Sequence, residues 1–307
     1  MASTRPSVPR PKTASSRVPA ASSRPDPLAV YRRIVARDRL LLALLAEHYL
    51  LSTPQIAAAF FTGLRTAQRR LTILHRLGVV HRFALPGPDP GAAPFLYALG
   101  PVGLQLYPSA YHDPDGVHGR APRSSLERAR RIAASRKLAH LLGVNQFFID
   151  LIRTARTTAP DGDGCRLGRW WSEQHATDVY AQAGIHPDGH GVWHACGHTV
   201  GFFLEHDNGT ENLARVIAKL RGYERLAGFG PRYPVLLWLP SPAREANLLS
   251  ALAGVPTAMP IATAVHGDDP AGPVWALSTS PARRRRLDEL PSDHGPHAPT
   301  NPNRYDQ

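Results

Sequence analysis

The stretch Leu64-Arg-Thr-Ala-Gln-Arg-Arg-Leu-Thr-Ile-Leu-His-Arg-Leu77, followed by Gly78-Val-Val80, decides the fold of the first half of the chain. Leu71, Leu74 and Leu77 recur at the spacing of one helix face, and glycine commonly ends a helix. The sequence therefore predicts a helix over 64–77 with an apolar face toward the core and a basic face outward.

Two more helices are predicted before this one. Residues 31–49 carry apolar side chains at helical spacing. A hydroxyl N-cap and a proline at the first helical position then start a short helix over 53–60. The Thr62-Gly63 pair predicts a tight turn between this helix and the next.

Two short strands are predicted after Gly78, over 79–83 and 95–99, with a loop rich in proline and glycine over 86–94. The order helix, helix, turn, basic helix and hairpin is typical of a winged helix-turn-helix. We therefore expect such a domain over 28–110.

The helix over 64–77 would then lie in the major groove of double-stranded DNA, where arginine can pair with guanine and glutamine with adenine. We expect the wing to contact phosphate. The alternatives are a solvated helix face and a protein-binding winged helix. The candidate DNA-binding residues are Arg65, Thr66, Gln68, Arg69, Arg70, Arg76 and Arg82.

The charge distribution favours a polyanionic partner for the first half. The 307 residues carry a net charge of +12, of which residues 28–110 hold +6 and residues 136–280 hold −1. Residues 1–27 have almost no large apolar side chain and predict a disordered basic tail, and residues 281–307 predict a second tail.

The sequence has no apolar run long enough to span a bilayer and no secretory signal, so we expect a cytoplasmic protein. Its two cysteines, Cys165 and Cys196, exclude a disulfide framework.

The second half predicts a different architecture after a linker over 111–128 rich in Pro, Gly, Asp and His. Helical spacing over 124–157 indicates one long helix or two consecutive ones. Three strands, a helix over 211–226 and a strand over 234–239 follow. We therefore expect an α+β protein whose second domain, 129–280, has the order αβββαβ.

This order resembles the core of the restriction-endonuclease-like superfamily, whose members hold Mg²⁺ with paired carboxylates. The resemblance implies Asp188 and Glu205 as metal ligands, with Glu173 as a further acid. Asp207 stands where that family usually has lysine, so Lys219 would have to reach the site from the following helix. An inactive scaffold of the same fold and a different α/β fold remain alternatives.

A second group of residues supplies nitrogen and sulfur ligands for a candidate zinc site, although it lacks a Cys-x₂-Cys pair. Alternation from Trp193 to Val200 predicts three of its members on one strand face. The group comprises His186, His190, His194, Cys196, His198 and His206.

The stretch Phe202-Phe-Leu-Glu-His-Asp-Asn-Gly-Thr-Glu211, followed by Lys219 and Tyr223, together with the winged helix, resembles the replication-relaxation family of plasmid and mobile-element proteins. The resemblance spans about 30–277. It implies a DNA-binding protein acting in replication, relaxation or transfer, with replication or transfer proteins as candidate partners. A metal-dependent nickase and a transcriptional regulator with a dimerising or ligand-binding second domain are the alternatives.

Overall fold

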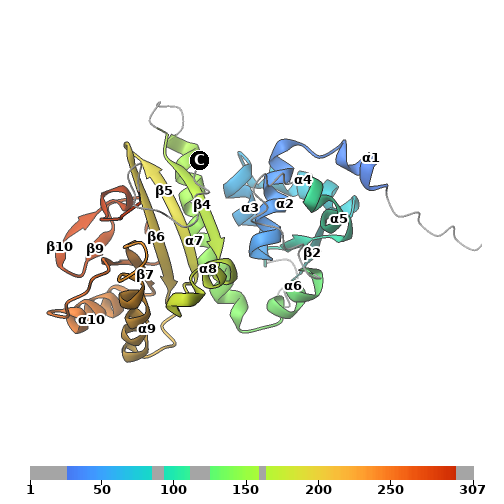
Figure 1. The fold of residues 1–307 in the computed structure, drawn as a ribbon. Coiled ribbons are helices and arrows are strands. Elements are labelled where there is room, and N and C mark those ends of the chain that lie inside the picture. Colours follow the sequence, from blue (N-terminus) through green and yellow to red (C-terminus); the bar gives the residue numbers. More distant parts are fainter. Residues whose placement is uncertain (1–25, 85–92, 111–124, 159–163, 295–307) are drawn as a thin grey trace, which may run out of the picture.

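The computed structural model describes residues 26–84, 93–110, 125–158 and 164–294. They form an N-terminal unit of helices with a small sheet and a C-terminal unit built on a large sheet (Figure 1). Most of the expected tails, the wing loop and the start of the linker lie outside the described residues.

The N-terminal unit contains the predicted helices and hairpin strands together with further elements. It comprises α1 (Pro27–Tyr31), α2 (Ala36–His48), β1 (Leu51–Ser52), α3 (Thr53–Phe60), α4 (Leu64–Arg76), β2 (Val80–Phe83), β3 (Leu96–Leu99) and α5 (Pro101–Ala110).

The second helix and both hairpin strands are confirmed, but the unit has features that the sequence did not predict. The first helix breaks at 32–35, where the Asp38 side chain accepts a hydrogen bond from the Val35 amide at 3.0 Å. The short strand β1 joins the hairpin antiparallel in a sheet of order β1-β3-β2. Ser52 and Gln55 cap the start of α3 reciprocally.

The C-terminal unit contains more elements than the expected αβββαβ order. It comprises α6 (Ser125–Ala133), α7 (Lys137–Thr158), β4 (Arg166–Ser172), α8 (Glu173–Val179), the 3₁₀ turn η2 (Ala181–Ala183), β5 (Gly189–Ala195), β6 (His198–His206), α9 (Leu213–Leu226), β7 (Val235–Leu239), α10 (Pro242–Leu252), β8 (Ile261–Val265), β9 (Trp275–Leu277), β10 (Ser280–Arg285) and η3 (Leu287–Glu289).

These strands form one seven-stranded mixed sheet of order β10-β9-β8-β7-β6-β5-β4. The central strands β6, β7 and β8 run parallel, and the outer pairs are antiparallel. On one face, α7 packs Phe147 and Phe148 against apolar side chains of the sheet. On the other face, α8, α9 and α10 cover a second apolar cluster.

Two regions expected to be a tail and a linker contain secondary-structure elements. Residues 280–285, in the expected tail from 281, form β10 against β9; Arg284 also forms an ion pair with Glu245 at 2.7 Å, and Leu287 and Leu290 are buried. The expected linker ends earlier, because α6 starts at Ser125 and buries Ala129 against β3.

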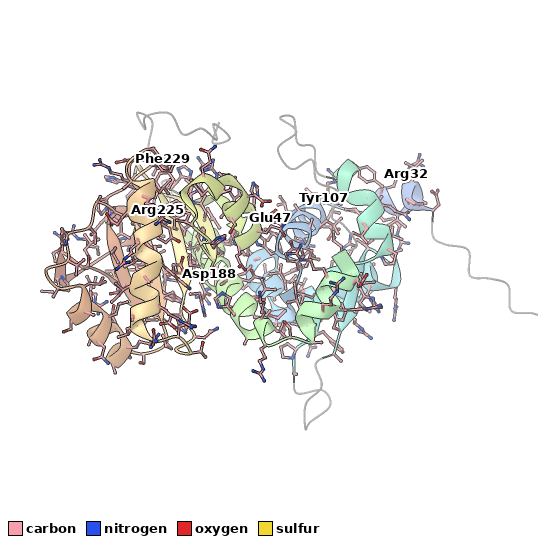
Figure 2. The ribbon with its side chains drawn as sticks, turned by 60° about the horizontal axis from the view of Figure 1, so that its bottom comes forward. Arg32, Glu47, Tyr107, Asp188, Arg225 and Phe229 are labelled. Atoms are coloured by element: carbon pink, nitrogen blue, oxygen red, sulfur yellow. The ribbon has the colours of Figure 1, made fainter. Side chains whose placement is uncertain are left out.

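The two units meet along α7, where buried polar groups are paired across the boundary. Asn145 donates to the Leu50 carbonyl and Gln55 donates to the Leu142 carbonyl, each at 2.9 Å. Glu47 lies at the same boundary and accepts from the amide of Ser172 at 2.9 Å (Figure 2). These bonds and the shared apolar cluster hold the two units in one arrangement. No helix in the described part of the chain is both long and apolar enough to cross a membrane.

Candidate functional site

Helix α4 presents an exposed polar face that contains most of the predicted DNA-binding residues. Its other face buries Ala67, Leu71 and Leu74 in the core. The polar face carries Arg65, Thr66, Gln68, Arg69 and Arg76, all exposed. Among the described residues, no ion pair engages Arg65, Arg69 or Arg76, so these guanidinium groups are available to a ligand.

Arg70 lies on the same helix and pairs with groups inside the protein. Its Nε donates to Oδ1 of the fully buried Asp38 side chain at 3.1 Å, and its Nη2 donates to the Arg33 carbonyl at 2.9 Å. Arg70 therefore ties α4 to the start of α2. Arg82 on β2 is exposed and its guanidinium stacks 4.7 Å from the ring centre of Phe95.

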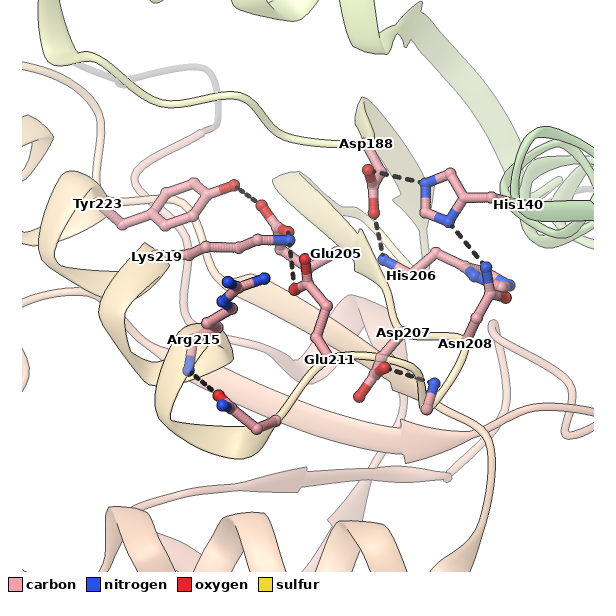
Figure 3. A network of polar contacts seen from close by, with 12 residues as sticks. His140, Asp188, Glu205, His206, Asp207, Asn208, Glu211, Arg215, Lys219 and Tyr223 are labelled. Atoms are coloured by element: carbon pink, nitrogen blue, oxygen red, sulfur yellow. Dashed lines mark hydrogen bonds and ion pairs between the residues drawn. The ribbon is translucent and has the colours of Figure 1, made fainter. Parts of the chain in front are cut away.

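The C-terminal unit brings Asp188 and Glu205 together where β5 begins beside the end of β6. The Asp188 amide donates to the Leu204 carbonyl at 2.9 Å, so the two acids come from adjacent strands. Asp188 accepts hydrogen bonds from the His206 amide at 2.7 Å and from Nε2 of His140 at 2.9 Å (Figure 3).

Glu205 is 5 % exposed and has two partners from α9. The Tyr223 hydroxyl donates to Oε1 at 2.5 Å, and Nζ of Lys219 lies 3.5 Å from Oε2 (Figure 3). Burial, reinforced by the nearby Asp188 charge, raises the pKa of Glu205 to about 8. The acid pair therefore favours a bound proton or cation near neutral pH.

Lys219 of α9 lies next to Glu205. Its ammonium lies 3.2 Å from the Glu211 carboxylate and also contacts Glu205. Lys219 and Tyr223 are four residues apart and therefore share one face of α9. The structure thus assembles a carboxylate pair and a lysine from three separate segments.

His140 and Tyr223 were not predicted as members of the site. His140 lies in the first turn of α7, where its hydrogen bond to Asp188 raises its pKa. The other ring nitrogen, Nδ1, accepts from Asn208 at 3.2 Å. The His140 partner Asp188 lies 48 residues away in sequence, so local spacing could not reveal the contact.

The neighbouring His206 packs tightly inside the structure. Its ring stacks on His266 with 4.4 Å between ring centres, and burial lowers its pKa to about 4. A Cβ at Gly143 of α7 would lie 2.4 Å from its Nε2. Glycine is therefore required at 143 for α7 to approach the sheet this closely.

Two other predicted acids, Asp207 and Glu173, make no hydrogen bond or ion pair to Asp188 or Glu205 among the described residues. Asp207 forms an ion pair with Arg244 of α10 and accepts from the Gly209 amide at 2.6 Å, so it anchors the loop after β6. Glu173 is exposed at the start of α8.

The predicted zinc group is not assembled. A turn at 196–197 separates β5 from β6, which breaks the expected alternation, and His190 is buried against the Phe202 carbonyl at 2.8 Å. In the described part of the chain, no three or more His, Cys, Asp or Glu side chains are grouped so as to hold a metal ion.

The acid pair nevertheless has the chemistry that suits Mg²⁺, which commonly binds one or two carboxylates and keeps several waters. Asp188 and Glu205 supply hard oxygen ligands, and the raised pKa of Glu205 reflects charge that a cation would neutralise. An ion held here would rest on two carboxylates and water.

A family model described as replication-relaxation matches residues 42–235, which spans α4, α7, the acid pair and Lys219. No curated protein and no solved structure matches the chain.

Proposed function

We propose that this chain, which belongs to the replication-relaxation family, binds double-stranded DNA through a winged helix formed by its N-terminal unit. The observation that carries the proposal is the exposed polar face of α4, with Arg65, Gln68 and Arg69 unengaged by ion pairs. A role in DNA replication, relaxation or transfer, on a plasmid or mobile element, agrees with the family.

The arrangement of the N-terminal unit supports this use of α4. Helix α3 packs on α7, and its Gln55 donates a hydrogen bond across the boundary. The side of the N-terminal unit that faces α7 is therefore buried against the C-terminal unit. Helix α4 lies beyond α3 and remains open to solvent (Figure 1). A helix with one face in the core and a basic face outward suits the major groove.

Binding to a labelled 40-base-pair duplex, followed by fluorescence anisotropy, tests this proposal. A bidentate base contact contributes about 1–3 kcal/mol, so Arg65→Ala/Arg69→Ala should weaken specific binding by about 10-fold or more. The double variant Arg153→Ala/Arg221→Ala removes the same charge from exposed sites on other helices and is the matched control. Equal affinities for the two variants would contradict the proposal.

A second candidate function is cleavage of a phosphodiester in the bound DNA. The observation that favours it is the contact of Lys219 with Glu205 beside Asp188, an arrangement that resembles the restriction-endonuclease-like sites. Asp188 and Glu205 would hold Mg²⁺, which would neutralise phosphodiester oxygens and position water. Lys219 would place its positive charge next to the phosphate, and Tyr223 would orient the Glu205 carboxylate.

Nicking of supercoiled plasmid with and without Mg²⁺ or Mn²⁺ tests this second function. The variants Asp188→Asn and Glu205→Gln should abolish metal-dependent nicking and leave duplex binding unchanged. Glu173→Gln is the control, because Glu173 lies exposed at the start of α8. If the wild-type protein binds DNA but never nicks it, the protein is a non-catalytic DNA-binding protein, either in replication or as a regulator.

A further inference from the structure

We propose that a basic surface on α6 and the first turn of α7 is a second contact for the DNA backbone, leading the duplex from the N-terminal unit toward Asp188 and Glu205. We call it the α6 surface. This proposal rests on the proposed DNA binding, and it gives the C-terminal unit a role in that binding.

The α6 surface is strongly and consistently basic. Its only acidic residue is Glu127, which pairs with Arg131 at 2.8 Å in an exposed i,i+4 contact of small energetic weight. Its five basic residues are all exposed, namely Arg128, Arg130, Arg131, Arg136 and Lys137. The C-terminal unit beyond it is close to neutral, so this patch is a local feature of the chain.

One end of the α6 surface is fixed to the N-terminal unit. Ala129 is fully buried in a cluster with Leu96 and Ala98 of β3. The Arg128 guanidinium lies 4.4 Å from the ring centre of Tyr49, and the charge of Arg130 reaches His81 on β2. A strand of the hairpin and the α6 surface are therefore neighbours.

The other end of the α6 surface leads into the acid site. Lys137 begins α7, and His140, one turn further, makes the hydrogen bond to Asp188. Across the site, Arg215 points its guanidinium toward Lys219 and Glu211 (Figure 3). Basic residues therefore lie on the α7 side and on the α9 side of the acid pair, as a phosphate backbone crossing the pair would require.

The size of the α6 surface fits a duplex. Nine residues of α6 extend about 13 Å at 1.5 Å per residue, which is the length of about four base pairs at 3.4 Å each. Among the exposed arginines of this surface, only Arg131 forms a described ion pair, so the charge of the others is available to phosphates. A duplex that docks on α4 and continues across α6 would contact both units.

The salt dependence of binding by the full-length protein tests the proposal. Each phosphate contact contributes about −0.9 to the slope of log K against log salt concentration. The variant Arg136→Ala/Lys137→Ala should therefore make the slope for a 40-base-pair duplex less negative by about 2. The control Arg153→Ala/Arg221→Ala, which loses the same charge, should change it by less than half a unit.

Duplex length separates this inference from the proposed function. On a 12-base-pair duplex, too short for both contacts, Arg136→Ala/Lys137→Ala should bind like wild type, whereas Arg65→Ala/Arg69→Ala should weaken binding at both lengths. If Arg136→Ala/Lys137→Ala matches the control at both lengths, the α6 surface is only a solvated face and the inference is wrong while α4 binding stands. If the wild-type protein binds neither duplex, the proposed function and the inference both fail.

Discussion

Replacing Arg70 with alanine should destabilise the fold far more than replacing its neighbour Arg69. Asp38 has a side chain with no exposed area, and Arg70 is its one cationic partner among the described residues. Removing one member of a buried ion pair costs about 3–5 kcal/mol, because the other charge is left uncompensated. Arg70 is 20 % exposed and the Val35 amide still donates to Asp38, so we expect the lower end, about 3 kcal/mol.

Urea unfolding followed by circular dichroism measures this difference. Arg69→Ala is the matched control, because Arg69 is exposed one position away and should change the free energy of unfolding by less than about 0.5 kcal/mol. DNA affinity should show the opposite order, with Arg69→Ala the weaker binder. Equal unfolding midpoints for the two variants would refute the scaffolding role of Arg70.

Three further predictions concern the packing around α7. Gly143→Ala should destabilise by about 1–3 kcal/mol in urea, because its Cβ would overlap the His206 ring; an unchanged midpoint would show that the ring moves freely. His48 is buried, which lowers its pKa from 6.5 to about 4, so its stabilisation is complete above pH 6.5 and declines toward pH 4. Between pH 7 and 5 this loss should reach about 2 kcal/mol, and His48→Phe should lack it. Gln55→Ala should cost about 1–2 kcal/mol by removing a cap and a bond to α7, and a neutral effect would argue against that contact.

The elements of the N-terminal unit could be predicted because their signals are local. The proline in α3 and the glycine after α4 mark helix ends, and the leucines of α4 repeat at helical spacing. By contrast, β1 has only two residues, too short for a period to show. It exists because Leu51 and Ser52 pair with β3, a partner more than 40 residues away.

The C-terminal unit was harder to predict, because contacts between residues far apart in sequence determine where its last strand lies. The Arg-rich run at 283–286 looks like a solvated tail in sequence. In the structure, the run forms the edge strand β10 against β9, and Arg284 pairs with Glu245 of α10. Such a bond has no sequence signature, because each partner alone is an ordinary surface charge.

The carboxylates of the candidate site could be predicted from the sequence, but the side chains that surround them could not. Asp188 and Glu205 stood out because they flank apolar strands, whereas Asp207, an equally plausible acid from spacing, turned out to face Arg244. In a continuing strand, residues 205 and 207 would share one face, but β6 ends at His206, so Asp207 no longer follows this alternation and pairs with Arg244 instead.

Helix α7 links the proposed DNA-binding surface to the acid site. Its apolar face covers the sheet, its Asn145 and Leu142 bond to Leu50, which precedes β1, and to Gln55 of α3, and its first turn places His140 on Asp188. A flexible connection would let the two units take many separations, so DNA held by one would meet the other only by chance. Here the buried bonds of Asn145 and Gln55 fix α4 relative to Asp188. A duplex bound on α4 would therefore pass the acid pair at one defined distance, which makes the duplex length needed for α6 contact a fixed property of this protein.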